Sequence, residues 1–344
     1  MAEITTKKPK IERVEPAAGI AGGEIGIHGR GFSGGDHGRP QVRFGGKEAT
    51  LLVASDDFLI ARVPEGSPDS LLEVRTPKGE SDQMAIELGV SIADNLHPVA
   101  NPVIDQEGNI FATVSGARGQ KVPISIYKFD RNYIAKPFLS NLVNATGLAL
   151  DAAGNLYVSS RHDGVVYQVT SASHKTVYAK GMGVATGIAF DADENLLVGD
   201  RTGTIFKVGH DRQIFVFATL EPSVAAYHLA FGPDQTLYVT GPTTSSYDSI
   251  YRIAPSGEVE VFYRGLGRPQ GLAFDQKGEL YVVASLAGRR GVVHFPRTGE
   301  PKLAISGQGL VGLAFGAGNR LVLATSNTLY HLNWPGTGGT RPRP

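Results

Sequence analysis

The chain has 344 residues, of which 44 are glycine and none is cysteine, and its 33 basic side chains equal its 33 acidic ones in number. The lack of cysteine excludes disulfides, a thiol nucleophile and cysteine-bound zinc, and the zero formal charge gives no overall field towards nucleic acid or an anionic membrane. A hydrophobic content of 41% allows a large buried core, and the glycine content indicates many tight turns.

Residues 1–8 carry lysines without an apolar run behind them, so we expect a flexible N-terminus and no secretory leader. The sequence as written predicts a cytoplasmic protein, whereas a leader removed ahead of this start would make the protein secreted or periplasmic. Nowhere do about 18 apolar residues follow one another, as a membrane-spanning helix would require. We therefore expect no membrane span.

Residues 9–89 have no copy elsewhere in the chain. They contain seven short apolar runs separated by glycine and proline: IERV, EIGIHG, QVRFGG, ATLLVAS, LIARVP, LLEVRT and MAIEL. This pattern is typical of an immunoglobulin-like β-sandwich of about seven strands, without the cysteine pair and tryptophan of antibody domains.

Particular residues of this stretch resemble the IPT/TIG family. They are Ile11, Glu15-Pro16, Gly22-Gly23, Ile27, Gly29, Gly31-Phe32, Val42, Phe44-Gly45-Gly46, Val63-Pro64 and Val74-Arg75-Thr76. The resemblance implies an interaction or spacer module at residues 9–89 that has no catalytic residues of its own.

The rest of the chain is repetitive. GLALDAAGNLYV at residues 147–158 returns as GIAFDADENLLV at 187–198 and as GLAFDQKGELYV at 271–282, and weaker copies begin at residues 101, 228 and 312. Each repeat reads as four short strands, which we call A to D, joined by tight turns, with almost no helical periodicity. Six repeats of about 41 residues predict a six-bladed β-propeller over residues 90–336.

The sixth repeat has only three strands before residues 337–344, which we expect to be a flexible tail. Residues 90–96, VSIADNL, stand ahead of the first repeat at the offset that a D strand occupies ahead of the third. We therefore expect residues 90–96 to pair with residues 328–334 and to close the ring, which removes an exposed sheet edge. The predicted fold is all-β: a sandwich followed by a closed propeller.

The repeat pattern of residues 90–336 resembles NHL and gluconolactonase-like propellers. The gluconolactonase resemblance implies carboxylate and amide metal ligands around the central channel, but the positions before each repeat hold Ala100, Thr146, Thr186, Tyr227, Gln270 and Val311. Asn101 is the nearest approach to such a ligand. We therefore predict no cofactor, with Ca²⁺ or Zn²⁺ kept for the enzyme alternative below.

DADEN at residues 191–195 matches the opening of a calcium loop. The same slot holds DQEGN, DAAGN and DQKGE in other repeats, which favours a turn with an initial aspartate.

His97, His162 and His228, with Asp163 and Asp200, are the only sequence candidates for an acid–base or metal cluster. Weak catalytic candidates are thus His97, His228 and Asp200, in a metal-dependent lactonase-like hydrolase or lyase. This enzyme is the first alternative to the binding function described next.

Charge separates by loop. The B-to-C and D-to-A loops are rich in arginine, whereas the A-to-B turns are acidic, and turn formation by aspartate explains the acidity. The preferred function is a monomer that binds a small hydroxylated or anionic ligand, or a protein partner, on the basic face. Expected ligand-binding residues are Thr146, Thr186, Tyr227, His228 and Gln270 at the channel mouth, with Arg161, Arg201, Arg289 and Arg290 on the rim.

A second alternative is binding of single-stranded RNA by the propeller. Base stacking needs exposed aromatic side chains between the arginines, and only Tyr227 and Tyr247 are available. We therefore do not expect a nucleic-acid partner.

Overall fold

The computed structural model describes residues 8–33, 38–67, 69–116 and 120–334, and this part of the chain contains strands and no helix. The all-β class is thus confirmed. Apart from Lys8, the ends that we expected to be flexible, residues 1–8 and 337–344, lie outside the described residues. The chain divides into two compact units: one is residues 1–91 with 289–292 and 303–308, and the other is residues 92–288, 293–302 and 309–344.

The first unit contains two antiparallel sheets. One has the order β1-β3-β7-β6, formed by β1 (Lys10–Glu15), β3 (Glu24–Arg30), β7 (Phe58–Arg62) and β6 (Thr50–Ala54). The other has the order β10-β8-β4-β5, formed by β10 (Met84–Ala85), β8 (Leu71–Thr76), β4 (Gln41–Phe44) and β5 (Lys47–Glu48), with β9 (Gly79–Glu80) beside β8. The unit also contains a short parallel pair of strands, β2 (Ala18–Gly19) and β11 (Glu87–Leu88).

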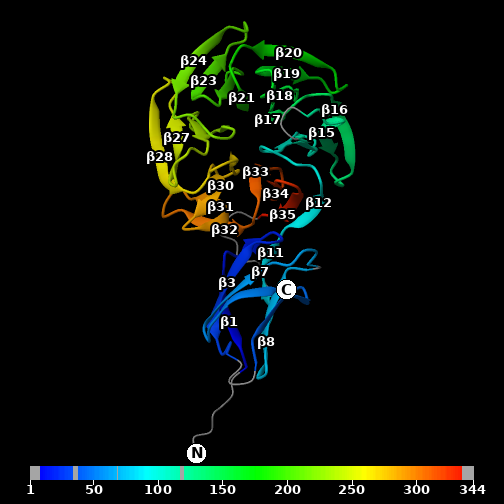
Figure 1. Ribbon diagram of the computed structural model, residues 1–344, viewed down its shortest axis with the longest axis vertical. Helices are drawn as coiled ribbons and strands as arrows, with labels where there is room; N and C mark the ends of the chain where they lie inside the picture. Colours follow the sequence, from blue (N-terminus) through cyan, green and yellow to red (C-terminus); the bar gives the residue numbers. More distant parts are fainter. Residues whose placement is uncertain (1–7, 34–37, 68, 117–119, 335–344) are drawn as a thin grey trace, which may run out of the picture. The chain divides into compact units, whose positions relative to one another are not determined.

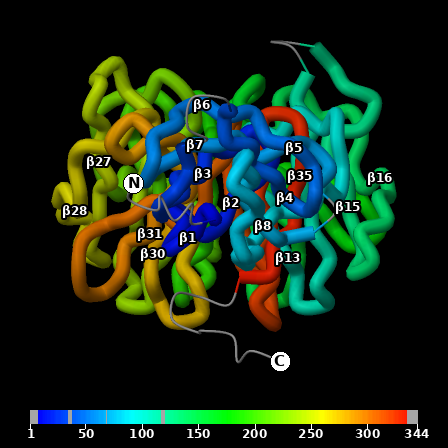
Figure 2. Tube along the Cα trace, turned by 90° about the horizontal axis from the view of Figure 1, so that it is seen from below, coloured from blue at the N-terminus to red at the C-terminus, as the bar shows by residue number. Residues whose placement is uncertain are grey.

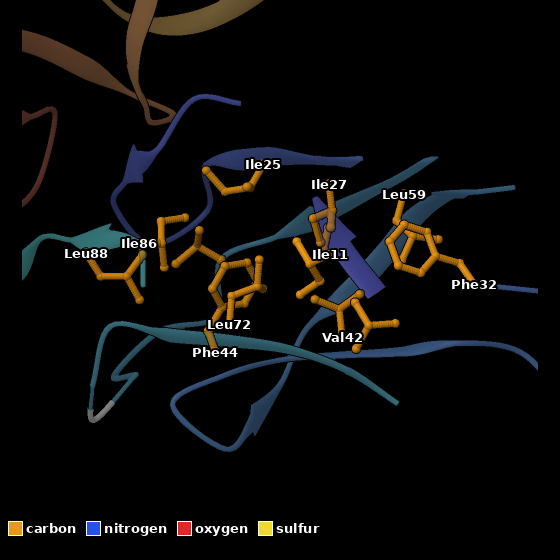
Figure 3. Close-up of a cluster of buried hydrophobic side chains, with 13 residues drawn as sticks. Ile11, Ile25, Ile27, Phe32, Val42, Phe44, Leu59, Leu72, Ile86 and Leu88 are labelled. Carbon is orange, nitrogen blue, oxygen red and sulfur yellow. The ribbon is translucent and has the colours of Figure 1, made fainter. Parts of the chain in front are cut away.

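Alternating side chains of both sheets form the core of this unit. Figure 3 shows them between two layers of strands, with Ile27 and Val42 among those labelled. The motif residues of the sequence pattern supply much of this core, since Ile11, Phe32 and Phe44 are also buried there. The sandwich expected from the apolar runs is therefore formed, because the period of two places every second residue inside.

Consecutive strands pair within each repeat (Figure 1). These sheets make up the second unit, except that residues 289–292 and 303–308 of repeat five belong to the first unit. Repeat one comprises β13 (Val103–Ile104), β14 (Ile110–Thr113), β15 (Ile124–Phe129) and β16 (Ala135–Ser140). Repeat two comprises β17 (Ala145–Leu150), β18 (Leu156–Ser160), β19 (Val165–Val169) and β20 (Lys175–Lys180). Repeat three comprises β21 (Ala185–Phe190), β22 (Leu196–Asp200), β23 (Thr204–Val208) and β24 (Ile214–Thr219).

The later repeats follow the same order. Repeat four comprises β25 (His228–Phe231), β26 (Leu237–Thr240), β27 (Asp248–Ile253) and β28 (Val259–Leu266). Repeat five comprises β29 (Leu272–Phe274), β30 (Leu280–Leu286), β31 (Arg289–Phe295) and β32 (Lys302–Ser306). Figures 1 and 2 show the D strands β16 and β28 at opposite sides of this unit, so the repeats follow one another around a common centre.

Repeat six contains β33 (Leu310–Phe315), β34 (Arg320–Thr325) and β35 (Leu329–Asn333), and β12 (Val90–Ala93) is the neighbour of β35 in its sheet. The residues after β12 continue along the same repeat, since the backbone N–H of Leu96 donates to the carbonyl of Asn327 at 3.0 Å. Leu96 is buried in a cluster that includes Ile110 and Leu329. The pairing expected for residues 90–96 is therefore present.

The repeats have two distinct ends. Strand A starts, and strand B finishes, at the end formed by the D-to-A and B-to-C loops, which we call the D-to-A end. The opposite A-to-B end holds the turns 105–109, 151–155, 191–195, 232–236, 275–279 and 316–320. At residues 191–195 the Asp191 carboxylate accepts the backbone N–H of Asn195 at 2.8 Å, so the interpretation of DADEN as a turn is confirmed.

Candidate functional site

The first residue of each repeat lies where the A strands approach one another at the D-to-A end. Four of these six residues are Gly147, Gly187, Gly271 and Gly312. A Cβ atom at Gly312 would lie 2.6 Å from the carbonyl oxygen of Ala100, and one at Gly187 would overlap the carbonyl of Tyr227. Only glycine allows so close an approach, so the centre of the repeats is narrow at this end.

Asn101 occupies the same slot in repeat one. Its Nδ2 donates to the carbonyl of Leu272 at 2.8 Å, and its Oδ1 accepts the backbone N–H of Leu313 at 3.1 Å. The amide thus links repeat one to repeats five and six. It serves the fold, although the sequence presented it as the nearest approach to a metal ligand.

His228 occupies this slot in repeat four. Its side chain is almost completely buried, and burial lowers its pKa to about 4, because the charged imidazolium loses its hydration. The ring is therefore neutral near pH 7. Within the described ranges no hydrogen-bond partner of the imidazole is found.

Three other predicted channel residues use their polar groups inside the repeats. Thr186 Oγ1 donates to the carbonyl of Gly199 at 2.8 Å and accepts the backbone N–H of Tyr227 at 3.1 Å. The Tyr227 hydroxyl donates to the backbone carbonyl of Glu221, and burial raises the pKa of Tyr227. Thr146 Oγ1 donates to the carbonyl of Asn144 at 2.9 Å. These groups connect neighbouring strands and loops.

Tyr227 is 1% exposed, although the sequence predicted it both as a ligand-binding residue at the channel mouth and as an aromatic side chain available for stacking on RNA bases. Its ring lies between Gly199 and Gly241, where an added Cβ would meet Tyr227 atoms at 2.9 and 2.6 Å. The ring is thus enclosed and cannot stack on a nucleotide base, whereas Tyr247 is 67% exposed. Gln270 is half-buried, and its backbone carbonyl accepts a hydrogen bond from the Thr240 hydroxyl.

The predicted rim arginines differ in burial and in the unit to which they belong. Arg201 is exposed, and Arg161 and Arg290 are half-buried. Arg289 belongs to the first unit, where its Nη2 donates to the backbone carbonyls of Glu15 at 2.9 Å and Glu24 at 3.3 Å. The sequence predicted Arg289 as a rim residue, whereas its guanidinium binds backbone carbonyls within the first unit.

The weak catalytic candidates stand in different settings. His97 is exposed, with Nδ1 3.3 Å from the carbonyl oxygen of Ser326. Asp200 is buried, and its carboxylate accepts the backbone N–H of Val184 at 2.8 Å and the hydroxyl of Thr202. In the described part of the chain no three His, Asp or Glu side chains gather in a group that could hold a metal.

The D-to-A end also holds buried polar atoms that lack a partner. Asp248 begins strand C of repeat four, and its Oδ1 accepts both the backbone N–H and the hydroxyl of Thr243, at 2.9 and 2.7 Å. Its Oδ2 is buried without a hydrogen bond, as are Oδ1 of Asn144 and Oγ of Ser115. Such groups are uncommon and call for a water molecule or a ligand group as partner.

A cleft lies at the A-to-B end, which the sequence did not indicate. It has a volume of about 620 Å³ and spans the turns of repeats five, six and one. A second hollow of about 430 Å³ shares Phe274, Asp275 and Gln276 with it and continues over repeats three and four. The middle of this end is thus open, in contrast to the narrow D-to-A end.

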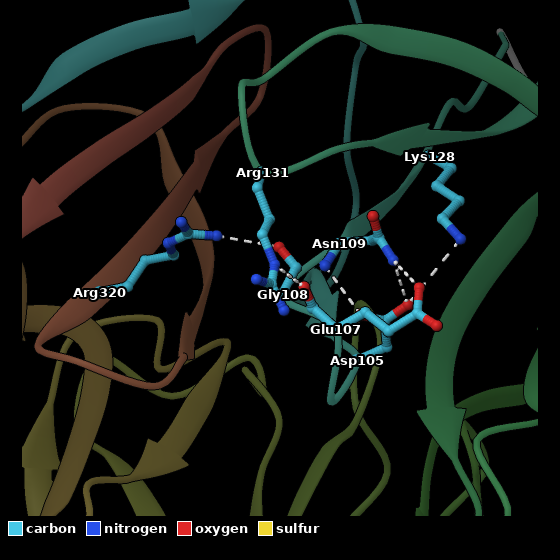
Figure 4. Close-up of polar contacts among 7 residues, drawn as sticks. All are labelled: Asp105, Glu107, Gly108, Asn109, Lys128, Arg131 and Arg320. Atoms are coloured by element: carbon cyan, nitrogen blue, oxygen red, sulfur yellow. Dashed lines mark hydrogen bonds and ion pairs between the residues drawn. The ribbon is translucent and has the colours of Figure 1, made fainter.

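Two arginines hold the turn that forms one wall of the cleft. Figure 4 shows Arg320 and Arg131 reaching residues 105–109, Arg320 from the start of β34 and Arg131 from the loop between β15 and β16. Arg320 Nη1 donates to the carbonyl of Gly108 at 2.9 Å, and Arg131 Nε donates to the carbonyl of Glu107. On the other side of the turn Asn109 donates to the Asp105 carboxylate at 2.7 Å.

A recurrent residue could have indicated this cleft. The last residue of strand A, directly before the turn, is apolar in every repeat and half-buried in the structure: Ile104, Leu150, Phe190, Phe231, Phe274 and Phe315. Five of these six line one of the two hollows. An aromatic residue repeated beside a turn, where strands normally become polar, was the available signal.

Comparison with known proteins gives one family match. Residues 9–91 match the model of the family described as the IPT/TIG domain. None of the curated proteins compared with the chain matches it. Among the described residues no helix is long and apolar enough to cross a membrane.

Solved structures of low sequence identity share the fold. A gluconolactonase from Xanthomonas campestris is 16% identical with a TM-score of 0.56, over 73% of this chain and 90% of that one. An auxiliary nutrient binding protein from Bacteroides ovatus is 10% identical with a TM-score of 0.55, over 95% and 98% of the two chains. A catalytically inactive virginiamycin B lyase from Staphylococcus aureus, solved with quinupristin, is 15% identical with a TM-score of 0.52, over 82% and 93%. The chain therefore contains an IPT/TIG domain at residues 9–91, and its β-structure is similar in fold to gluconolactonase-like propellers.

Proposed function

We propose that this protein is a binding protein whose propeller takes a small hydroxylated or anionic ligand at the centre of the D-to-A end. The observation that carries the proposal is the buried, neutral imidazole of His228, which has no partner within the described ranges. A neutral imidazole donates from one nitrogen and accepts at the other, so it matches a ligand hydroxyl. Arg161 and Arg201 of the same unit supply positive charge at this end, and no metal takes part.

Two further observations support binding at this end. The Oδ2 atom of Asp248 is buried without a partner, and a ligand hydroxyl would satisfy it. The propellers with a similar fold include a nutrient-binding protein and a gluconolactonase, whose names place small nutrients and sugar lactones among the ligands of this fold. We therefore choose a sugar acid as the test ligand.

The proposal includes the full propeller ring. The six repeat sheets are six blades, and β12 closes the ring by supplying the outer strand of the sixth blade. The position of β12 beside β35 and the burial of Leu96 among side chains of repeats one and six support this closure. A closed ring holds the D-to-A loops in fixed positions around one centre.

Thermal unfolding and calorimetry with gluconate test this function. We expect gluconate to raise the melting temperature of the protein by roughly 2–4 °C, as a ligand that binds only the folded state does. His228→Leu keeps an apolar side chain of similar size in the slot but removes both nitrogens, so the increase should disappear while the unliganded variant still melts cooperatively. An increase that survives in His228→Leu would contradict the proposed site.

Hydrolysis of gluconolactone distinguishes the enzyme alternative. We expect the rate with the protein to equal the uncatalysed rate, both with and without a metal chelator. Hydrolysis that is accelerated by the protein and lost with the chelator would replace the binding function by a metal-dependent lactonase.

A further inference from the structure

The strongest unassigned feature of the second unit is a pair of guanidinium groups in the A-to-B cleft. Arg131 lies between strands C and D of repeat one, and Arg320 begins strand B of repeat six. A Cβ atom placed on Gly108 would lie 3.4 Å from Nη1 of Arg320 and 3.5 Å from Nε of Arg131. The two cations therefore meet at one turn, although they are 189 residues apart in the sequence.

Among the described residues neither guanidinium has an acidic partner. Each donates to a backbone carbonyl of the turn, and in the described part of the chain no carboxylate lies within 4.0 Å of either group. Arginines elsewhere do form such pairs, as Arg252 does with Glu260. One bond uses one of the five N–H donors of a guanidinium, so both groups keep donors for a ligand.

The carboxylates that line the cleft already have donors of their own. The Asp105 carboxylate accepts from the backbone and side chain of Asn109, and Lys128 lies 3.9 Å from it. Glu107 Oε2 accepts from Asn109 Nδ2 at 3.0 Å. Asp275 Oδ1 accepts the N–H groups of two residues of its turn, each at 2.9 Å. These bonds fix the turns and hold the three carboxylates in place, although the carboxylates keep their negative charge. The two arginines are the cationic groups of this lining and retain N–H donors for a ligand.

The remaining wall of the cleft is apolar. Phe274, Phe315 and Ile104 are half-buried and contribute to its lining. Phe315 packs edge-on against Tyr281, and Phe274 packs edge-on against Tyr238, with ring centres 5.0 Å apart in each pair. The two phenylalanines are thus held in place and present hydrocarbon surface beside the arginines.

We propose that this cleft is a second binding site, for a small organic carboxylate that carries an aromatic or apolar ring. The carboxylate lies between Arg131 and Arg320, which donate to its oxygens, and the ring packs on Phe274 and Phe315. Charge-assisted hydrogen bonds of this kind are the stronger ones in proteins, and arginine matches a carboxylate in shape. The site lies at the end opposite to His228 and is independent of the function proposed above.

Four small probes separate the chemical requirements. They are 3-phenylpropanoate, which has the ring and the carboxylate, 3-phenylpropanol, which has the ring alone, gluconate, which has the carboxylate alone, and phenethylamine, which has the ring and a positive charge. We expect 3-phenylpropanoate to bind the full chain with a dissociation constant at or below about 1 mM. The alcohol and the amine should bind at least tenfold more weakly. Gluconate should bind at the D-to-A end whether or not Arg131 and Arg320 are present.

Substitutions of the two arginines test the site, and Arg297 offers a matched control. Arg131→Gln and Arg320→Gln should each weaken 3-phenylpropanoate roughly ten- to hundredfold, since each removes a charged hydrogen bond. Arg297 also donates to a turn carbonyl, that of Lys277, but does not line the cleft. Arg297→Gln should therefore leave the affinity unchanged while it removes an equivalent structural bond.

Gln276 gives a test that leaves the turns intact. Its side chain is exposed and lines the cleft. Gln276→Lys should strengthen binding of 3-phenylpropanoate and Gln276→Glu should weaken it, each by a factor of about three or more. The proposal is overturned if 3-phenylpropanoate does not bind, if the alcohol binds as tightly, or if the two charge changes have the same effect. His228→Leu should not alter this binding, so failure of either site can be recognised separately.

Discussion

The two ends of the repeats use the same strands in opposite ways. At the D-to-A end the glycine slots bring the A strands together, and Asn101, Thr186 and Tyr227 use their polar groups to bond neighbouring repeats. At the A-to-B end the turns of repeats one to five are each closed by an aspartate, and phenylalanines and arginines surround open hollows. A polar residue where the A strands meet is therefore as readily explained by bonds between repeats as by a ligand.

The largest expected effect concerns the glycine slots. Gly187→Ala should reduce the free energy of unfolding by about 3 kcal/mol, because the new methyl group overlaps the carbonyl of Tyr227 in a packed region. Gly154→Ala, at the A-to-B end, has no atom within 4 Å of the added group and should cost about 1 kcal/mol through its positive φ of 80°. Urea unfolding measures both. Equal losses would mean that the two ends are packed alike.

Acid sensitivity comes next. The pKa of His228 is lowered from 6.5 to about 4 by burial, so the unfolded chain binds a proton that the folded chain does not between these values. The neutral side chain of His228 therefore makes its full contribution to the free energy of unfolding above pH 6.5. As the pH drops towards 4, the free energy of unfolding falls through this group by at most about 3 kcal/mol. Urea unfolding at pH 7 and pH 4.5 should show a larger difference for the natural protein than for His228→Leu. The same difference in both proteins would exclude this histidine as the cause.

A smaller loss in the free energy of unfolding is expected when the side-chain hydrogen bonds of Asn101 are removed. Asn101→Ala leaves the carbonyl of Leu272 and the N–H of Leu313 without this partner, and should lower the free energy of unfolding by about 2 kcal/mol. Asn155→Ala removes one side-chain bond, to Asp151, from a turn at the open end and should cost about 0.5–1 kcal/mol. Chemical denaturation compares them, and a larger loss for Asn155→Ala would reverse the ranking of the two ends.

The smallest effect belongs to the rim. Arg201 is exposed, so Arg201→Gln should change the free energy of unfolding by less than about 0.5 kcal/mol. If the proposed function holds, the same variant weakens gluconate binding. A stability loss above 1 kcal/mol would show that Arg201 supports the loops.

The sequence was informative where short-range chemistry decides the structure. The repeated strand pattern and the turn aspartates correctly predicted strands β17 to β20, and the 86-residue offset correctly placed β12 beside β35. The motif of residues 9–89 likewise identified its own core. In each case the alternation of apolar residues, or a turn-forming residue, determines the local structure of only a few neighbouring residues.

The site was harder to predict because it depends on long-range neighbours. Nothing in the local sequence of Arg131 shows that Arg320 reaches the same turn. Likewise, nothing near Arg289 in the sequence shows that its guanidinium donates a hydrogen bond to the backbone carbonyl of Glu15. For Thr146 and Tyr227 the sequence could not show which carbonyls would accept hydrogen bonds from their hydroxyl groups. Residue type alone therefore overestimated the number of free polar groups.

The aspartate turns have a consequence for engineering. In residues 151–155 the carboxylate of Asp151 binds the backbone N–H and the side chain of Asn155, at 2.7 and 2.8 Å, and Gly154 takes the left-handed conformation. Ala152 and Ala153 stand between these fixed points and are exposed. The frame of the turn thus does not depend on the identity of these two residues. Such turns are grafting positions, at which short recognition sequences can be exchanged on a stable scaffold without redesign of the strands.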